Sequence, residues 1–180
     1  MPEDNVDVPL FTPDKWLDLQ ESIENLETGG TGGGETVVVL QNDFTNSTTS
    51  ITNSPLSFTP EPNKLYIWEV HLVLETDTAT TGVRPGITEP SSGVEFYVGN
   101  GFVPNTQTTN AVKSFGDSTS TSVNSTGYSY ANEPFYGKIE GMLKTGSSPV
   151  GDLVVTLGSE IDSSEVKILA GSVLIYKEVV

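Results

Sequence analysis

The sequence predicts an all-β protein, an antiparallel β-sandwich of jelly-roll-like type, preceded by a short N-terminal arm and helix. From residue 35 onward, short runs rich in Val, Ile, Leu, Phe and Tyr alternate with turn residues, which is typical of sandwiches. No convincing helical pattern recurs in that region, which disfavours α/β architectures. The length of 180 residues suits one domain with one core plus a small appendage.

The first eleven residues are predicted to form an extended arm. Pro2 and Pro9 discourage a helix there. The apolar residues of the arm alternate with polar neighbours and end in a phenylalanine: Val6, Val8, Leu10 and Phe11. An arm of this kind usually lies on another surface.

A helix of about 15 residues is predicted next. Thr12, Pro13 and Asp14 supply its N-cap, first position and first-turn acid, and the glycines after Thr28 end it. A narrow apolar stripe recurs at spacings of three, four and three residues: Trp16, Leu19, Ile23 and Leu26. Since an isolated helix of this length is marginal in water, the stripe needs a partner, which is a docking protein, a second subunit or the β body.

A glycine-rich linker is predicted at residues 29–34, between a docking or oligomerisation segment at 1–28 and a β-sandwich body at 35–180. The linker lacks the Lys-Ser/Thr pair of a phosphate-binding loop, and no strand precedes it. Residues 1–28 contain eight acidic residues against Lys15 alone, a net charge of -7. That charge disfavours close bundling of the helices unless a basic partner offsets it.

Nine β-type runs are predicted in the body: 36–41, 49–59, 64–75, 81–88, 94–98, 111–115, 135–144, 153–157 and 166–177. The run at 64–75 has one wholly apolar face, which predicts a core strand: Tyr66, Trp68, Val70, Leu72 and Leu74. In the last run the apolar alternation shifts phase after Ala170, which predicts a β-bulge at Gly171.

Charge and composition exclude several classes of partner and site. A net charge of -16 and only eight scattered basic residues argue against nucleic acid and anionic membranes. With no cysteine, disulfides, thiolate nucleophiles and zinc-thiolate sites are ruled out. The acidic N-terminus predicts a protein made in the cytoplasm without a signal peptide.

Catalysis is not expected, and neither is a cofactor or a bound metal. His71 is the only histidine, and no Gly-x-Ser-x-Gly elbow supplies a nucleophile. A carboxylate pair for glycoside hydrolysis has candidates in Glu69, Glu95 and Glu140, although no spacing selects two of them. Calcium stays a minor alternative because five aspartates fall in predicted loops: Asp43, Asp77, Asp117, Asp152 and Asp162.

Three stretches of the body carry a resemblance. They are Leu56-Ser57-Phe58-Thr59 with Asn63-Lys64-Leu65-Tyr66, the segment from Thr80 to Gly86, and the ending from Lys167 to Tyr176. Together they resemble small virion proteins of tailed bacteriophages, of the capsid-decoration, head-fibre or tail-fibre type. The resemblance implies a jelly-roll-like body, often trimeric, that is attached to a capsid or tail by its N-terminal segment and presents its loops outward.

Two functions follow as hypotheses. The first is a capsid decoration or cement protein on the virion surface, whose partner is the major capsid protein or another virion protein, and which forms a homotrimer. Its docking contacts would be Val6, Val8, Leu10, Phe11, Trp16, Leu19, Ile23 and Leu26. The second is a tail- or head-fibre module that binds a receptor or glycan through aromatic residues of polar loops: Phe102, Tyr128, Tyr130 and Tyr136.

Overall fold

The computed structural model describes residues 34–104, 110–116, 121–122 and 131–179. The chain divides between Gly34 and Glu35, and residues 35–180 form a compact unit. All regular structure in the described ranges is β-strand, and every strand pair is antiparallel. The all-β prediction is therefore confirmed. The predicted arm and helix fall outside the described residues.

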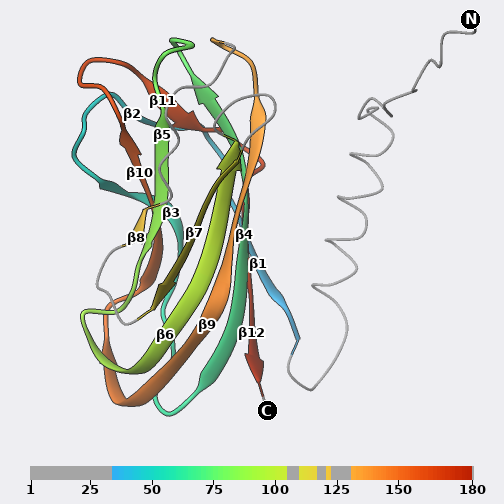
Figure 1. Ribbon diagram of the computed structural model, residues 1–180. Helices are drawn as coiled ribbons and strands as arrows, with labels where there is room; N and C mark the ends of the chain where they lie inside the picture. The colour runs from blue at the N-terminus through green and yellow to red at the C-terminus, as the bar shows by residue number, and fades with distance from the viewer. Residues whose placement is uncertain (1–33, 105–109, 117–120, 123–130, 180) are drawn as a thin grey trace, which may run out of the picture. The chain divides into compact units, whose positions relative to one another are not determined.

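Twelve strands are described in two sheets (Figure 1). The larger sheet has the order β1-β12-β4-β9-β6-β7, with β11 pairing both β4 and β2, and the smaller has the order β3-β10-β5-β8. The strands are β1 Thr36–Val39, β2 Phe44–Asn46, β3 Thr52–Phe58, β4 Leu65–Thr76, β5 Val83–Thr88, β6 Ser92–Pro104, β7 Asn110–Gly116, β8 Thr121–Ser122, β9 Phe135–Val150, β10 Leu153–Ser159, β11 Val166–Ile168 and β12 Val173–Val179.

One apolar core joins the two sheets. The five residues predicted for the apolar face of β4, from Tyr66 to Leu74, are all buried in it, as predicted. The smaller sheet adds Leu56 of β3, Ile87 of β5 and Leu157 of β10 to the same cluster. Two antiparallel sheets thus pack face to face, as in a β-sandwich.

Trp68 is the largest fully buried side chain, and glycine makes room for it. Its ring stacks on Tyr97 with centroids 6.0 Å apart and planes 9° apart. On β9, the residue directly opposite Trp68 is Gly141, and a Cβ added there would lie 2.5 Å from the indole Cζ2. The close approach of the tryptophan to the sheet therefore requires glycine at this position.

The predicted one-residue bulge at Gly171 is wrong, because the irregularity there is an insertion of two residues between two strands. The predicted run 166–177 is in fact two strands, β11 and β12. Ile168 at the end of β11 pairs with Leu74 of β4, and Val173 at the start of β12 pairs with His71. Four residues, 169–172, therefore separate the two strands, whereas only two residues of β4 separate their partners. This insertion adds two residues, so the alternation keeps its phase: Ile168 and Leu174 are both fully buried. Gly171 has a φ of 88°, which explains the glycine.

Two short strands, β2 and β8, were not predicted. They contain three and two residues, which is too few to show an alternating pattern. Strands β6 and β9 are also longer than the runs 94–98 and 135–144 predict. The longer strands extend the larger sheet, whose outer face carries the features described next.

A candidate interaction surface on the outer face of the larger sheet

The outer face of the larger sheet is set by the alternation of β4. With even-numbered residues in the core, the odd-numbered residues from Leu65 to Val73 face away from it. The register then places three side chains of β9 beside them, so that His71 pairs Lys138, Glu69 pairs Glu140 and Ile67 pairs Met142. Along the strands this surface has an aromatic end, a charged middle and an apolar end.

At the aromatic end, Tyr136 contacts both Phe102 and His71. The Phe102 and Tyr136 ring centroids lie 5.6 Å apart at an interplanar angle of 57°. The Tyr136 hydroxyl lies 2.7 Å from Nδ1 of His71. Partial burial raises the pKa of the Tyr136 hydroxyl, although the side chain is still 44% exposed. Two aromatic faces and an imidazole are thus presented together on a surface that solvent reaches.

In the charged middle, Lys138 joins two glutamates that lie directly opposite each other. Its Nζ is 2.8 Å from a carboxylate oxygen of Glu69 and 2.8 Å from one of Glu140. Without the lysine, two like charges would face each other across β4 and β9. Hydrogen bonds to Glu140 and Glu69 raise the pKa of Lys138, and the bond from Lys138 lowers the pKa of Glu69.

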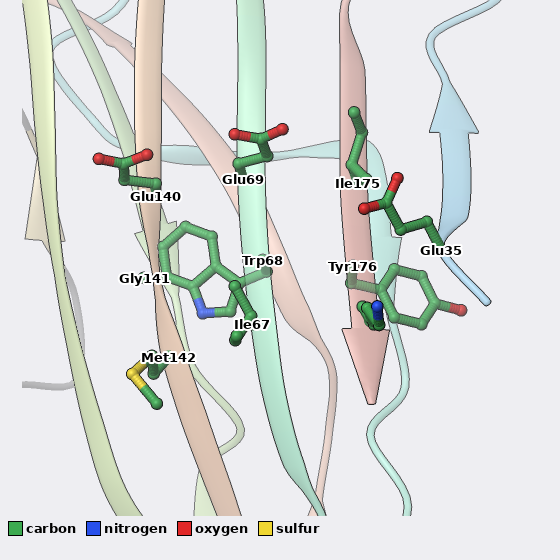
Figure 2. Close-up of a pocket in the computed structure, with 10 residues that line it drawn as sticks. Glu35, Ile67, Trp68, Glu69, Glu140, Gly141, Met142, Ile175 and Tyr176 are labelled. Carbon is green, nitrogen blue, oxygen red and sulfur yellow. The ribbon is translucent and has the colours of Figure 1, made fainter. Parts of the chain in front are cut away.

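The apolar end is an open depression with a volume of about 540 Å³. Ile67, Met142 and Ile175 line it, together with Glu35 and Lys177 at its rim. Figure 2 shows the two carboxylates of the charged middle at one end of the depression, with Ile67 and Met142 at the other. An open hollow of this kind on a sheet face suits contact with another surface rather than enclosure of a small molecule.

The predicted glycan-contact residues are partly brought together. Their predicted placement in loops is wrong for Phe102 and Tyr136, which lie in the neighbouring strands β6 and β9 and contact each other. Tyr128 and Tyr130 lie outside the described residues. All eight predicted docking residues, from Val6 to Leu26, also lie outside them. The sequence analysis missed the role of Lys138, because only the register between β4 and β9 places it between two glutamates.

Each of the three glutamates considered for glycoside hydrolysis is paired with a lysine. A glycosidase needs a carboxylic acid whose pKa is raised. Here the pKa of Glu69 is lowered, Glu140 shares the same lysine, and Glu95 pairs with Lys144 at 2.6 Å. Glu69 thus has the opposite of the pKa shift that a catalytic acid needs.

Three of the predicted calcium aspartates accept hydrogen bonds from the protein itself. Asp77 accepts one from Ser164 at 2.6 Å, which is the main reason that the pKa of Asp77 is lowered. Asp43 accepts one from the Ala170 amide, and Asp152 accepts one from the hydroxyl of Thr59. Within the described part of the chain, no group of three or more histidines and carboxylates is placed to hold a metal ion.

Comparison with models of known protein families and with curated proteins found no match. The resemblance to phage virion proteins therefore stays a prediction. Over the described ranges, no helix combines the length and the hydropathy needed to cross a membrane. Function is accordingly inferred from the body and from the sequence of the segment before it.

Proposed function

We propose that the chain is a non-enzymatic structural protein of a virion surface, a capsid decoration or cement protein that attaches through residues 1–28. The observation that carries this proposal is the self-contained body. Every residue of the described core lies between Leu40 and Leu174. The attachment itself is proposed from the sequence of residues 1–28, whose predicted arm and helix carry apolar residues that need a partner.

The proposal includes a jelly-roll connectivity for the body, and the strand order supports it. With β1, β3, β4, β5, β8, β9, β10 and β12 counted as eight strands, the larger sheet runs first, eighth, third, sixth. The smaller sheet runs second, seventh, fourth, fifth. These orders are those of a jelly roll, a fold used in viral capsids and lectins. Strands β6 and β7 are then an inserted antiparallel hairpin that widens the larger sheet.

The proposed partner is the major capsid protein or another virion protein, and the chain is proposed to be a homo-oligomer, with a trimer favoured. Several N-terminal segments joined in one oligomer would engage one shell together, so each contact could be weak. The glycine-rich linker lets the body stand clear of the shell. The net charge of -16 on the whole chain favours solubility and disfavours contact with nucleic acid.

A binding assay with capsids tests the attachment. Removal of residues 1–28 should abolish co-sedimentation with capsids, while circular dichroism and thermal unfolding show a body that is still folded. The matched variant keeps the length and the charge of the segment but replaces Trp16 and Leu19 by serine, and it should also lose binding. Retained binding by the truncated chain would contradict the proposal.

A second candidate is a fibre module that binds a glycan or receptor. The Phe102–Tyr136 pair favours it, because Tyr136 is exposed and aromatic rings stack on the apolar faces of sugars. The carboxylates of Glu69 and Glu140 and the ammonium of Lys138 lie beside the rings and could hydrogen-bond sugar hydroxyls. This candidate uses the body and leaves residues 1–28 for attachment.

A glycan array probed with the full-length chain tests the second candidate. If the rings stack on a sugar, Tyr136→Ala loses the binding and Tyr136→Phe keeps most of it, because only the alanine removes the ring. An Ile161→Ala variant serves as the control, since this residue is exposed on the segment between β10 and β11. An array without any bound glycan would count against the candidate.

A further inference from the structure

Exposed apolar side chains gather on the outer face of the larger sheet. Six large hydrophobic residues are exposed in the described ranges, and four of them belong to this face: Ile67, Val98, Tyr136 and Val179. The partly buried Met142 lies next to Ile67 on one side and Val98 on the other, so the three form a continuous row across β4, β9 and β6. A row of this kind on one face marks an interaction surface better than scattered exposed residues do.

The same face is nearly neutral in a strongly acidic molecule. Its basic side chains are Lys138, Lys144, Lys167 and Lys177, and its acidic ones, with those at its margin, are Glu35, Glu69, Glu75, Glu95 and Glu140. The net charge of this set is -1, whereas residues 35–180 carry 16 acidic and seven basic residues, a net charge of -9. Most of the excess negative charge of the body therefore lies on other surfaces.

Ion pairs within the face satisfy most of these charges. Lys138 binds Glu69 and Glu140, and Lys144 binds Glu95 at 2.6 Å. A surface whose charges are paired internally exerts little long-range field. The aromatic and apolar side chains thus flank a charged middle whose charges are already paired, which lowers the cost of burying this face against another protein.

We propose that this face binds another copy of the chain. Copies with a net charge of -16 repel each other, and this face carries little of the net charge of the body, so the repulsion across it is small. A basic partner would be drawn to the acidic remainder of the body instead. This inference assigns the contact between copies in the proposed homo-oligomer to this face. It is tested independently of the proposed attachment to a capsid.

Two matched isoleucines provide the first test. Ile67 on the face is 50% exposed and Ile161 away from it is 45% exposed, so a glutamate at either position changes the net charge equally and fills no core space. The masses of the full-length wild type, Ile67→Glu and Ile161→Glu are measured by light scattering over a range of concentrations. The wild type and Ile161→Glu should associate alike. Ile67→Glu should raise the dissociation constant by about tenfold or more, because a charge would be buried without a partner.

Two results overturn the inference. One is a wild type that stays monomeric at every soluble concentration. The other is an Ile67→Glu variant that associates as the wild type does, which would place the contact elsewhere and leave the attachment role of residues 1–28 untouched.

The absence of cysteine from the chain permits a second, direct readout. Ile67→Cys and Ile161→Cys each place one thiol in the full-length protein, and a short thiol-to-thiol crosslinker joins thiols of neighbouring copies. Covalent dimers should form with Ile67→Cys and not with Ile161→Cys. Equal yields from the two variants would overturn the inference even if Ile67→Glu failed to fold.

Discussion

The two faces of strand β4 are built from alternate residues of one segment and obey different rules. On the inner face, Tyr66, Trp68, Val70, Leu72 and Leu74 are each 4% exposed or less. On the outer face, apolar, acidic and imidazole side chains share the strand, and Ile67 is half exposed. Burial alone defines the inner face. The aromatic, charged and apolar parts of the outer face arise where the side chains of β4 pair with those of the strands that flank it.

The largest expected effect is a difference in stability between substitutions of two neighbouring residues, Trp68 and Ile67, on opposite faces of β4. Trp68→Ala should lower the free energy of unfolding by about 3–5 kcal/mol, since it empties the site of the largest buried side chain. Ile67→Ala, one residue away and half exposed, should cost less than about 1 kcal/mol in the isolated body. Urea unfolding of both variants measures the difference, and similar losses would show that the outer face is also part of a packed core.

A second substitution tests how closely Trp68 packs on the sheet. Gly141→Ala would place a methyl group against the carbonyl oxygen of Val98 and 2.5 Å from the indole, so we expect a loss of about 1–3 kcal/mol. Gly146→Ala lies on the same strand, β9, where the nearest atom would be 3.6 Å away, and should be close to neutral. Denaturation midpoints compare the two, and a neutral Gly141→Ala would mean that the ring can move aside without loss.

A third substitution addresses the insertion that keeps the two faces in phase. The Ser172 hydroxyl accepts a hydrogen bond from the Val73 amide at 2.9 Å and donates one to the Leu169 carbonyl at 2.8 Å. Ser172→Ala removes the buried hydroxyl and leaves the partly buried Val73 amide without its acceptor, and should cost about 1–2 kcal/mol. The exposed Ser148→Ala is the control. Hydrogen exchange should also accelerate at Val73, and unchanged protection there would contradict this role.

Much of the inner face could be predicted from the sequence, because it depends on local alternation. The core residues of β4 follow directly from the alternation of apolar residues along its sequence. Most strands also begin within a few residues of the predicted runs. The number of extra residues after Ile168 could not be predicted from the sequence. It is defined only by which residues of β4 pair with β11 and β12. The strands β2 and β8 are too short to carry any period.

The candidate surface was harder to predict because it depends on pairing between distant segments. Glu69 and Glu140 are separated by 70 intervening residues, and only the register of β4 with β9 sets them opposite each other. The same register brings Lys138 between them. Phe102 and Tyr136 were singled out as aromatic residues for glycan contact, yet their contact with each other follows from strand order and not from any local pattern.

The smallest expected effect belongs to the charged middle of the outer face. Lys138→Met removes the cation that holds Glu69 and Glu140 together, and should cost up to about 1 kcal/mol at neutral pH, since these side chains are partly exposed. Lys144→Met, which breaks only the more exposed pair with Glu95, should cost less.

The pH dependence of that effect identifies its cause. The folded pKa of Glu69 is lowered, so its contribution is present above the unfolded value of about 4.3 and is lost as the pH falls through the folded pKa. The folded pKa of Lys138 is raised, so its contribution is present below about 10.4 and is lost at higher pH. The difference in the free energy of unfolding between wild type and Lys138→Met should therefore be constant near neutral pH and decrease at both acidic and strongly alkaline pH. Urea unfolding across this range measures it, and a difference that persists in acid would mean that the ion pairs with Glu69 and Glu140 are not its cause.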